Sequence, residues 1–161
     1  MRRFLFILVQ LTWGLPQSLL GFILFLYWRK RGAPHRTYHG AIVTEWAAGG
    51  GISLGLFVFV SEKASRYMRD GRELSPAESK RGVLVHEYGH CIQSLMLGPL
   101  YLIAVGIPSN AWANLPALRR IRREKSMSYY AVYPENWANQ LGEWAASENS
   151  VGQAMPVRKT A

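Results

Sequence analysis

The sequence has a single cysteine, no internal repeat and no low-complexity tract. Cys91 has no partner, so no intramolecular disulfide can form, and an active domain that faces the cytosol is expected rather than a secreted one. No nucleic-acid-binding motif is present, so nucleic acid is not expected as a partner. The formal net charge of +9 fits an anionic membrane surface or an acidic substrate better.

Charge is also missing from a long stretch near the start, between Phe4 and Trp28. Its length would cross a hydrocarbon core of about 30 Å as a helix, but Gly14 and Pro16 should kink or break that helix. Three interpretations remain open: a kinked span, a pair of short helices that dips into the bilayer and returns, and a buried helical hairpin in a soluble protein. Basic residues at both ends favour the pair. Residues 1–31 are therefore predicted to form a hydrophobic, membrane-associating helical hairpin, with lipid as a partner.

The remaining chain predicts a mostly α fold with a small β element, an α+β domain over residues 32–147. Residues 41–46 and 52–60 are rich in β-branched and aromatic side chains, which indicates a β-hairpin or two neighbouring strands. Ser75 begins a capping box that predicts a helix to about Leu97. A short helix is expected from Pro134, and residues 148–161 are expected to be a disordered tail.

The strongest chemical signal is the string His86-Glu87-Tyr88-Gly89-His90. Histidines four positions apart lie on one face of a helix, where both imidazoles can bind one zinc ion at about 2.0–2.1 Å. Glu87 lies beside that face and is predicted to act as the general base on a zinc-bound water. Because the motif falls inside an apolar segment, burial of three such groups without a function would be costly.

A catalytic zinc site needs a third protein ligand, and Glu135 is the best candidate. It falls in the first turn of the later helix, where it can face the metal helix or simply complement the helix dipole. Asn139, one turn on, can hold the far nitrogen of a ligand histidine, and Ala138 would let the two helices approach closely. Tyr129 and Tyr130 are possible oxyanion stabilisers, although packing would also explain either ring.

These residues resemble the zincin metallopeptidases, and the later Glu-x-x-Ala-Asn resembles their gluzincin branch, with Asn139 where that branch has an aspartate. Much of the chain also resembles uncharacterised small bacterial membrane-associated proteins with this core, through residues 86–94, 98–101 and 106–109. The resemblance implies His86, His90 and Glu135 as zinc ligands, Glu87 as the base and a peptide or protein substrate. It also implies a bacterial inner-membrane protein with its active site towards the cytoplasm, and an upstream strand, within residues 52–60, that binds the peptide by edge pairing.

Two other readings stay open. The His-Glu-x-Gly-His form also resembles site-2-type intramembrane proteases, and Asn114-Leu115-Pro116 resembles part of their second motif, but no Leu-Asp-Gly triplet is present and Asp70 is the only aspartate. A non-catalytic membrane protein with a structural zinc site would need a fourth ligand. The sequence therefore favours a membrane-associated zinc metallopeptidase.

Overall fold

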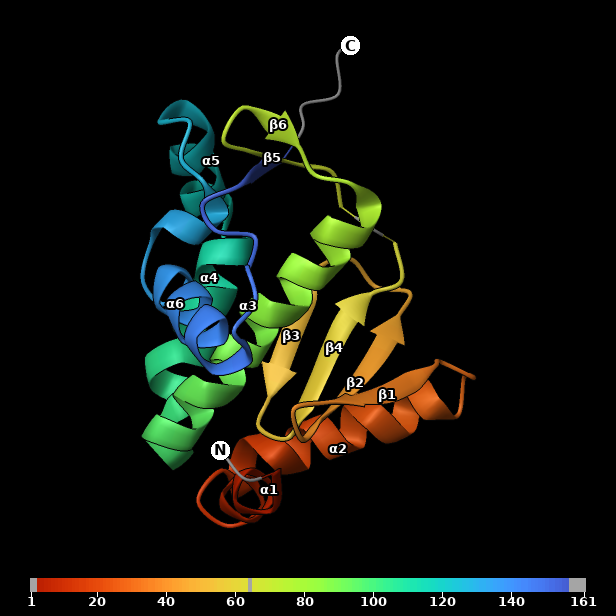
Figure 1. Ribbon diagram of the computed structural model, residues 1–161. Coiled ribbons are helices and arrows are strands. Elements are labelled where there is room, and N and C mark those ends of the chain that lie inside the picture. Colours follow the sequence, from red (N-terminus) through yellow and green to blue (C-terminus); the bar gives the residue numbers. More distant parts are fainter. Residues whose placement is uncertain (1–2, 64, 157–161) are drawn as a thin grey trace.

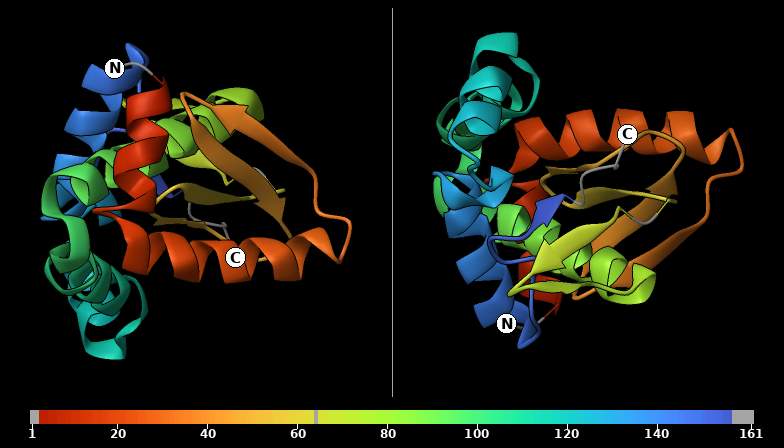
Figure 2. Two further views of the ribbon diagram at one scale, coloured as in Figure 1. Left: turned by 90° about the horizontal axis from the view of Figure 1, so that it is seen from below. Right: turned by 90° about the horizontal axis from the view of Figure 1, so that it is seen from above.

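A four-stranded sheet lies between helix α2 on one face and helix α3 on the other (Figures 1 and 2). This computed structural model describes residues 3–63 and 65–156. The helices are α1 (Arg3–Leu11), α2 (Leu15–Arg29), α3 (Pro76–Leu97), η1 (Gly98–Leu100), η2 (Leu102–Gly106), α4 (Ile107–Asn114), α5 (Pro116–Glu124), η3 (Tyr129–Ala131) and α6 (Glu135–Ala146). The strands are β1 (His35–Tyr38), β2 (Ala41–Trp46), β3 (Gly51–Leu54), β4 (Phe57–Ser61), β5 (Tyr67–Arg69), β6 (Arg72–Glu73) and β7 (Met155–Pro156). The predicted α+β class, with helices in the majority, is confirmed.

The main sheet has the order β1-β2-β4-β3, which leaves β3 as an edge strand. The apolar run 52–60 is not one strand, because the chain reverses at Gly55, whose φ of +61° suits a glycine. β3 and β4 therefore form the hairpin, and β2 pairs with β4 in parallel. The predicted hairpin between residues 41–46 and 52–60 is wrong, whereas the alternative of neighbouring strands holds for β2 and β4.

Strand β4 is buried on both faces because helices cover both sides of the sheet. Phe57 packs against Phe22 and Phe25 of α2, with ring centroids 5.9 and 5.5 Å apart. Alternate residues point to the other face, where Ser53 of β3 reaches the backbone of α3. A strand buried on both sides needs no polar alternation, which explains why the run 52–60 hardly alternates.

Helix α3 forms where the sequence predicts it, from Pro76 to Leu97. Ser75 accepts a hydrogen bond from the backbone N–H of Glu78, and the Glu78 carboxylate accepts one from the backbone N–H of Ser75. This capping box satisfies two amide groups that a helix start otherwise leaves unpaired. The helix ends at Gly98, whose φ of +52° is in the left-handed region.

Helices α3 and α6 pack unusually closely, and small residues make this possible. A Cβ atom at Gly89 would lie only 1.8 Å from the carbonyl oxygen of Ala138, and one at Gly142 would lie 2.1 Å from that of Val85. Ala138 is fully buried at this contact, in line with the close approach that the sequence predicts for it. The contact brings the first turn of α6 over the middle of α3 (Figure 1).

The two N-terminal helices are bent by 97° at the break between them, and the predicted hairpin geometry is not confirmed. The break falls at Thr12–Gly14, just before Pro16. Gln10 and Gln17 donate hydrogen bonds to the carbonyl groups of Cys91 and Gly98, which ties each helix separately to the α3 region. Among the described residues, no single helix is long and apolar enough to cross a bilayer; α1 and α2 meet that requirement only as this bent pair.

The segment predicted to be a disordered tail begins with residues that pack on the protein. Val151 and Ala154 are buried, and the carbonyl of Gly152 accepts a hydrogen bond from Asn139. Strand β7 pairs with β5, so apolar contacts and strand pairing order residues 148–156. The rest of the predicted tail, residues 157–161, lies outside the described residues.

Candidate metal centre

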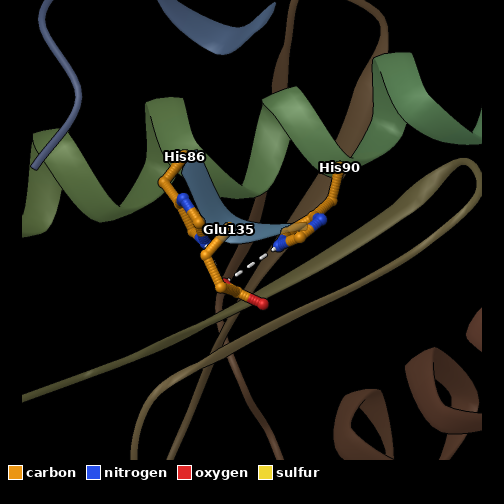
Figure 3. Close-up of side chains that lie close together, drawn as sticks. All are labelled: His86, His90 and Glu135. Atoms are coloured by element: carbon orange, nitrogen blue, oxygen red, sulfur yellow. Dashed lines mark ion pairs between the residues drawn. The ribbon is translucent and has the colours of Figure 1, made fainter. Parts of the chain in front are cut away.

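Three side chains from two helices converge at the contact of α3 and α6 (Figure 3). The Nε2 atoms of His86 and His90 lie 3.1 and 3.5 Å from Oε2 of Glu135. All three side chains are buried. Ligands about 2.1 Å from a tetrahedral metal ion lie about 3.4 Å from one another, so these two separations are compatible with one shared metal ion. The structure thus places together the three residues that the sequence predicts as ligands.

The far nitrogen of each imidazole contacts a side-chain amide whose orientation is determined by a second bond. Nδ1 of His86 lies 2.9 Å from Oδ1 of Asn139, and Nδ2 of Asn139 donates to the carbonyl of Gly152. Nδ1 of His90 lies 2.7 Å from Oε1 of Gln93, and Nε2 of Gln93 donates to the carbonyl of Pro134. Because each amide uses its N–H group elsewhere, its oxygen accepts a hydrogen bond from the N–H at Nδ1. In neutral histidines the lone pairs are then on the two Nε2 atoms.

The donor set fits a bound cation. Two Nε2 lone pairs and a carboxylate repel each other unless a positive charge lies between them, and neither oxygen of buried Glu135 has a hydrogen-bond partner among the described residues. Burial opposes the charged form of Glu135, but the neighbouring histidines outweigh this and hold its pKa well below the usual range. Burial also opposes the charged form of His90 and so lowers its pKa, but the neighbouring Glu135 outweighs this and raises the pKa to about 8.

Glu87 lies beside this group on α3, and its carboxylate points towards the edge strand β3. Oγ of Ser53 lies 2.7 Å from Oε2 of Glu87 and 2.7 Å from the Glu87 carbonyl oxygen, and it can donate to either. A Cβ atom at Gly51 would lie 2.3 Å from Oε1 of Glu87, so a larger residue there would displace this carboxylate from its present position. Glu87 is buried yet lines the cleft, which suits a group that exchanges protons with a bound molecule.

The two candidate tyrosines differ in their surroundings. Tyr129 lines the cleft beside Glu135, and its hydroxyl lies 3.4 Å from Oγ of Ser109. Burial and the charge of Glu135 raise the pKa of Tyr129 far above its usual value, so the hydroxyl keeps its proton. Tyr130 packs its ring against His86, and its hydroxyl bonds to that of Tyr67 at 3.0 Å. Of the two tyrosines, only Tyr129 therefore lines the same part of the cleft as Glu135.

The centre opens into a groove between β3 and α4. One part, of about 510 Å³, contains all four groups, His86, Glu87, His90 and Glu135. A second part, of about 420 Å³, adjoins it and shares Gly51 and Tyr129 among its walls. The groove therefore runs along the edge strand and past the metal centre on both sides.

Sequence reasoning missed three residues that support the site: Gln93, Ser53 and Gly51. Gln93 lies three positions after His90, so helical spacing could have indicated that it shares the ligand face. Ser53 and Gly51 approach Glu87 only through tertiary packing, and their sequence neighbourhood carries no signal for this contact.

Comparisons with family models, with curated proteins and with solved structures give no match for this chain. The inference about its function therefore depends on the site itself. The group His86, His90 and Glu135 can hold a metal ion, in agreement with the His-Glu-x-x-His pattern.

Proposed function

We propose that the protein is a zinc-dependent metallopeptidase of the gluzincin type, with His86, His90 and Glu135 as ligands and Glu87 as general base. The observation that carries the proposal is the convergence of two imidazole lone pairs and a buried carboxylate, with Asn139 and Gln93 orienting the rings. Such outer hydrogen bonds are the usual support of histidine ligands. Two nitrogen ligands and one oxygen ligand leave a fourth position of a tetrahedral ion for water or substrate.

Zinc, when bound, supplies a Lewis acid that lowers the pKa of water toward about 7. The chain's own residues then handle protons and position the substrate. Glu87 accepts a proton at its carboxylate and returns it to the leaving amine, while Ser53 holds the carboxylate in place. Tyr129 donates a hydrogen bond to the oxygen of the scissile carbonyl as negative charge develops there.

The edge strand β3 supplies the place for a peptide. Ser61 N–H donates to the carbonyl of Gly50, so by alternation the backbone groups of Gly51 and Ser53 point away from β4. The Ser53 carbonyl accepts a hydrogen bond from Tyr101, which leaves the N–H and C=O of Gly51 and the N–H of Ser53 for a substrate strand. Pairing at this edge would hold an extended peptide across Glu87 and the metal centre.

Two observations favour this reading over the alternatives. A site-2-like protease would need an aspartate as the third ligand, in the place of Glu135. Asp70 is the only aspartate, and it lies in the β5–β6 turn with a side chain that is 90% exposed, so it cannot be this ligand. A structural zinc site would need four protein ligands, and among the described residues no further His, Cys, Asp or Glu joins the group of three.

Zinc content tests the ligand assignment. The purified protein is expected to hold about one zinc ion per chain, and Glu135→Gln is expected to lose most of it because a neutral amide replaces the anionic ligand. Elemental analysis after dialysis measures this, with Glu143→Gln as the matched control on the same helix. Glu143 accepts hydrogen bonds from Ser150, which a glutamine oxygen can also accept. Equal zinc in both variants would contradict the role of Glu135.

Association with a membrane surface is the second part of the proposal. Most of the exposed large hydrophobic side chains lie between Phe4 and Tyr27, and Arg29, Lys30 and Arg31 follow directly. Helix α2 has 15 residues and so is about 22 Å long, too short to cross the hydrocarbon core. Since the domain covers the inner faces of α1 and α2, we infer that the bent pair lies in one leaflet as an interfacial anchor, with the site towards the cytoplasm.

Vesicle flotation tests this anchor. The protein is expected to float with vesicles that contain anionic lipid, and the double variant Leu19→Asn/Ile23→Asn is expected to bind at least about 10-fold more weakly, because both side chains lie on the outer face of α2. Trp144→Asn, at an even more exposed position on α6, is the control and should float as the unmodified protein does. Flotation of the double variant at the unmodified level would refute the assignment of this face.

A further inference from the structure

The groove past the metal centre has two unlike ends. The end next to His90 has apolar walls, and among its described lining residues only Glu87 and Glu135 carry a charge. The other end, beyond Glu87, is cationic. The apolar walls include Leu54, Leu102, Ile107 and Leu115, and the cationic walls include Lys63, Lys80 and Arg122.

Arg122 is the cation whose surroundings point to a ligand. Its Cζ lies 5.1 Å from the ring centroids of both Trp112 and Tyr129, so the two rings hold the guanidinium in the wall. Its Nη1 is buried and has no hydrogen-bond partner, and no carboxylate pairs with it among the described residues. Lys80, in contrast, already pairs with Glu45 at 3.3 Å. A guanidinium that two aromatic rings hold in the groove wall, with no carboxylate of its own, is half of a carboxylate-binding site.

Tyr129 places this cation next to the reacting groups, because its ring contacts Arg122 and also lines the groove beside Glu135. We propose that Arg122 binds a carboxylate of the substrate, so that the groove takes a polypeptide segment with apolar side chains at the Leu102 end and an acidic group at the Arg122 end. This inference rests on the proposed peptidase function. It adds the substrate class to that function.

The edge strand determines the direction of the segment. β3 runs from Gly51, which lines both parts of the groove, to Leu54, which lines only the apolar part. Antiparallel pairing is the more stable kind, so the apolar residues lie on the amino side of the scissile bond and the carboxylate on the carboxyl side. The apolar end also adjoins α2, since Gly55 packs against Ser18. A segment that leaves the lipid surface would therefore meet the apolar end first.

Peptide binding tests the proposal without relying on turnover. Fluorescent peptides are titrated against zinc-loaded Glu87→Gln protein and followed by anisotropy. Three peptides share an apolar amino half: one has Asp and Glu in an amidated carboxyl half, one has Asn and Gln there, and one is neutral with a free terminal carboxylate. The acidic amidated peptide is expected to bind about 10- to 100-fold more tightly than the neutral amide. Preference for the third peptide instead would identify the terminal carboxylate as the ligand of Arg122.

Arg122→Gln in the same background should abolish this preference, while Arg123→Gln, an exposed neighbour on α5, should keep it. Equal binding of all three peptides, or a preference that survives Arg122→Gln, overturns the proposal. The comparison among peptides does not depend on the fold of any Arg122 variant. If the unmodified protein hydrolyses peptides without preferring acidic ones, the Arg122 site is refuted and the proposed peptidase function stands. If acidic peptides bind more tightly but no peptide is hydrolysed, the peptidase function is refuted and the Arg122 site stands.

Discussion

Glu87→Gln is expected to retain zinc and to lower kcat for peptide hydrolysis by about 10²- to 10⁴-fold, the usual contribution of a general base. The amide has nearly the same shape and can still accept a hydrogen bond from Ser53, but it cannot take up a proton. The measurement is kcat on a quenched fluorescent peptide together with zinc content. Because Glu87 is not one of the three converging ligands, kcat should fall while the zinc content stays unchanged.

Glu62→Gln is the matched control, since Glu62 is exposed and outside the groove, and its kcat should not change. Hydrolysis at the unmodified rate by Glu87→Gln would refute the assigned base. Loss of zinc together with activity would instead place Glu87 among the groups that hold the metal.

Gly89→Ala is expected to destabilise the protein by about 3 kcal/mol or more, the upper range for overpacked sites. The added Cβ would lie 1.8 Å from the backbone oxygen of Ala138, and a backbone carbonyl cannot move aside as a flexible side chain can. Helix α6 must then shift away from α3 and take Glu135 with it. We therefore expect the variant to lose zinc affinity as well, as measured by urea unfolding and by elemental analysis.

Gly106→Ala serves as the control, because a Cβ there would meet its nearest neighbour, Cδ2 of Leu102, at an ordinary 3.7 Å. It should retain its stability and its zinc. An unchanged free energy of unfolding for Gly89→Ala would mean that the two helices are not packed as described. Gly89 is also the residue that supported a site-2-like reading, and helix packing now gives this glycine a different physical reason.

Local sequence signals predicted the elements that carry the chemistry. The capping box at Ser75 and Glu78 predicted α3, because both partners of the box lie within one turn. Helical spacing placed His86 and His90 on one face, and the first turn after Pro134 placed Glu135 on the second helix. These inferences held because each one depends on residues that are close in the chain.

Predictions that depended on contacts distant in sequence were wrong or incomplete. The run 52–60 looked like one strand, but its reversal at Gly55 leaves β4 inside the sheet and β3 at the edge. The N-terminal pair looked like a hairpin, but hydrogen bonds from Gln10 and Gln17 to the α3 region hold the two helices separately. Residues 148–156 looked disordered in isolation, and burial of Val151 orders them.

The sequence alone determined that two imidazoles and an adjacent carboxylate share one helix, since a repeat of 3.6 residues per turn leaves no other arrangement within α3. Only the tertiary structure decided that Glu135 meets them, because this contact depends on the missing side chains of Gly89 and Gly142, where two backbones touch. The same holds for the ring orientations: Asn139 and Gln93 face Nδ1 because Gly152 and Pro134, brought there by the fold, occupy their N–H groups.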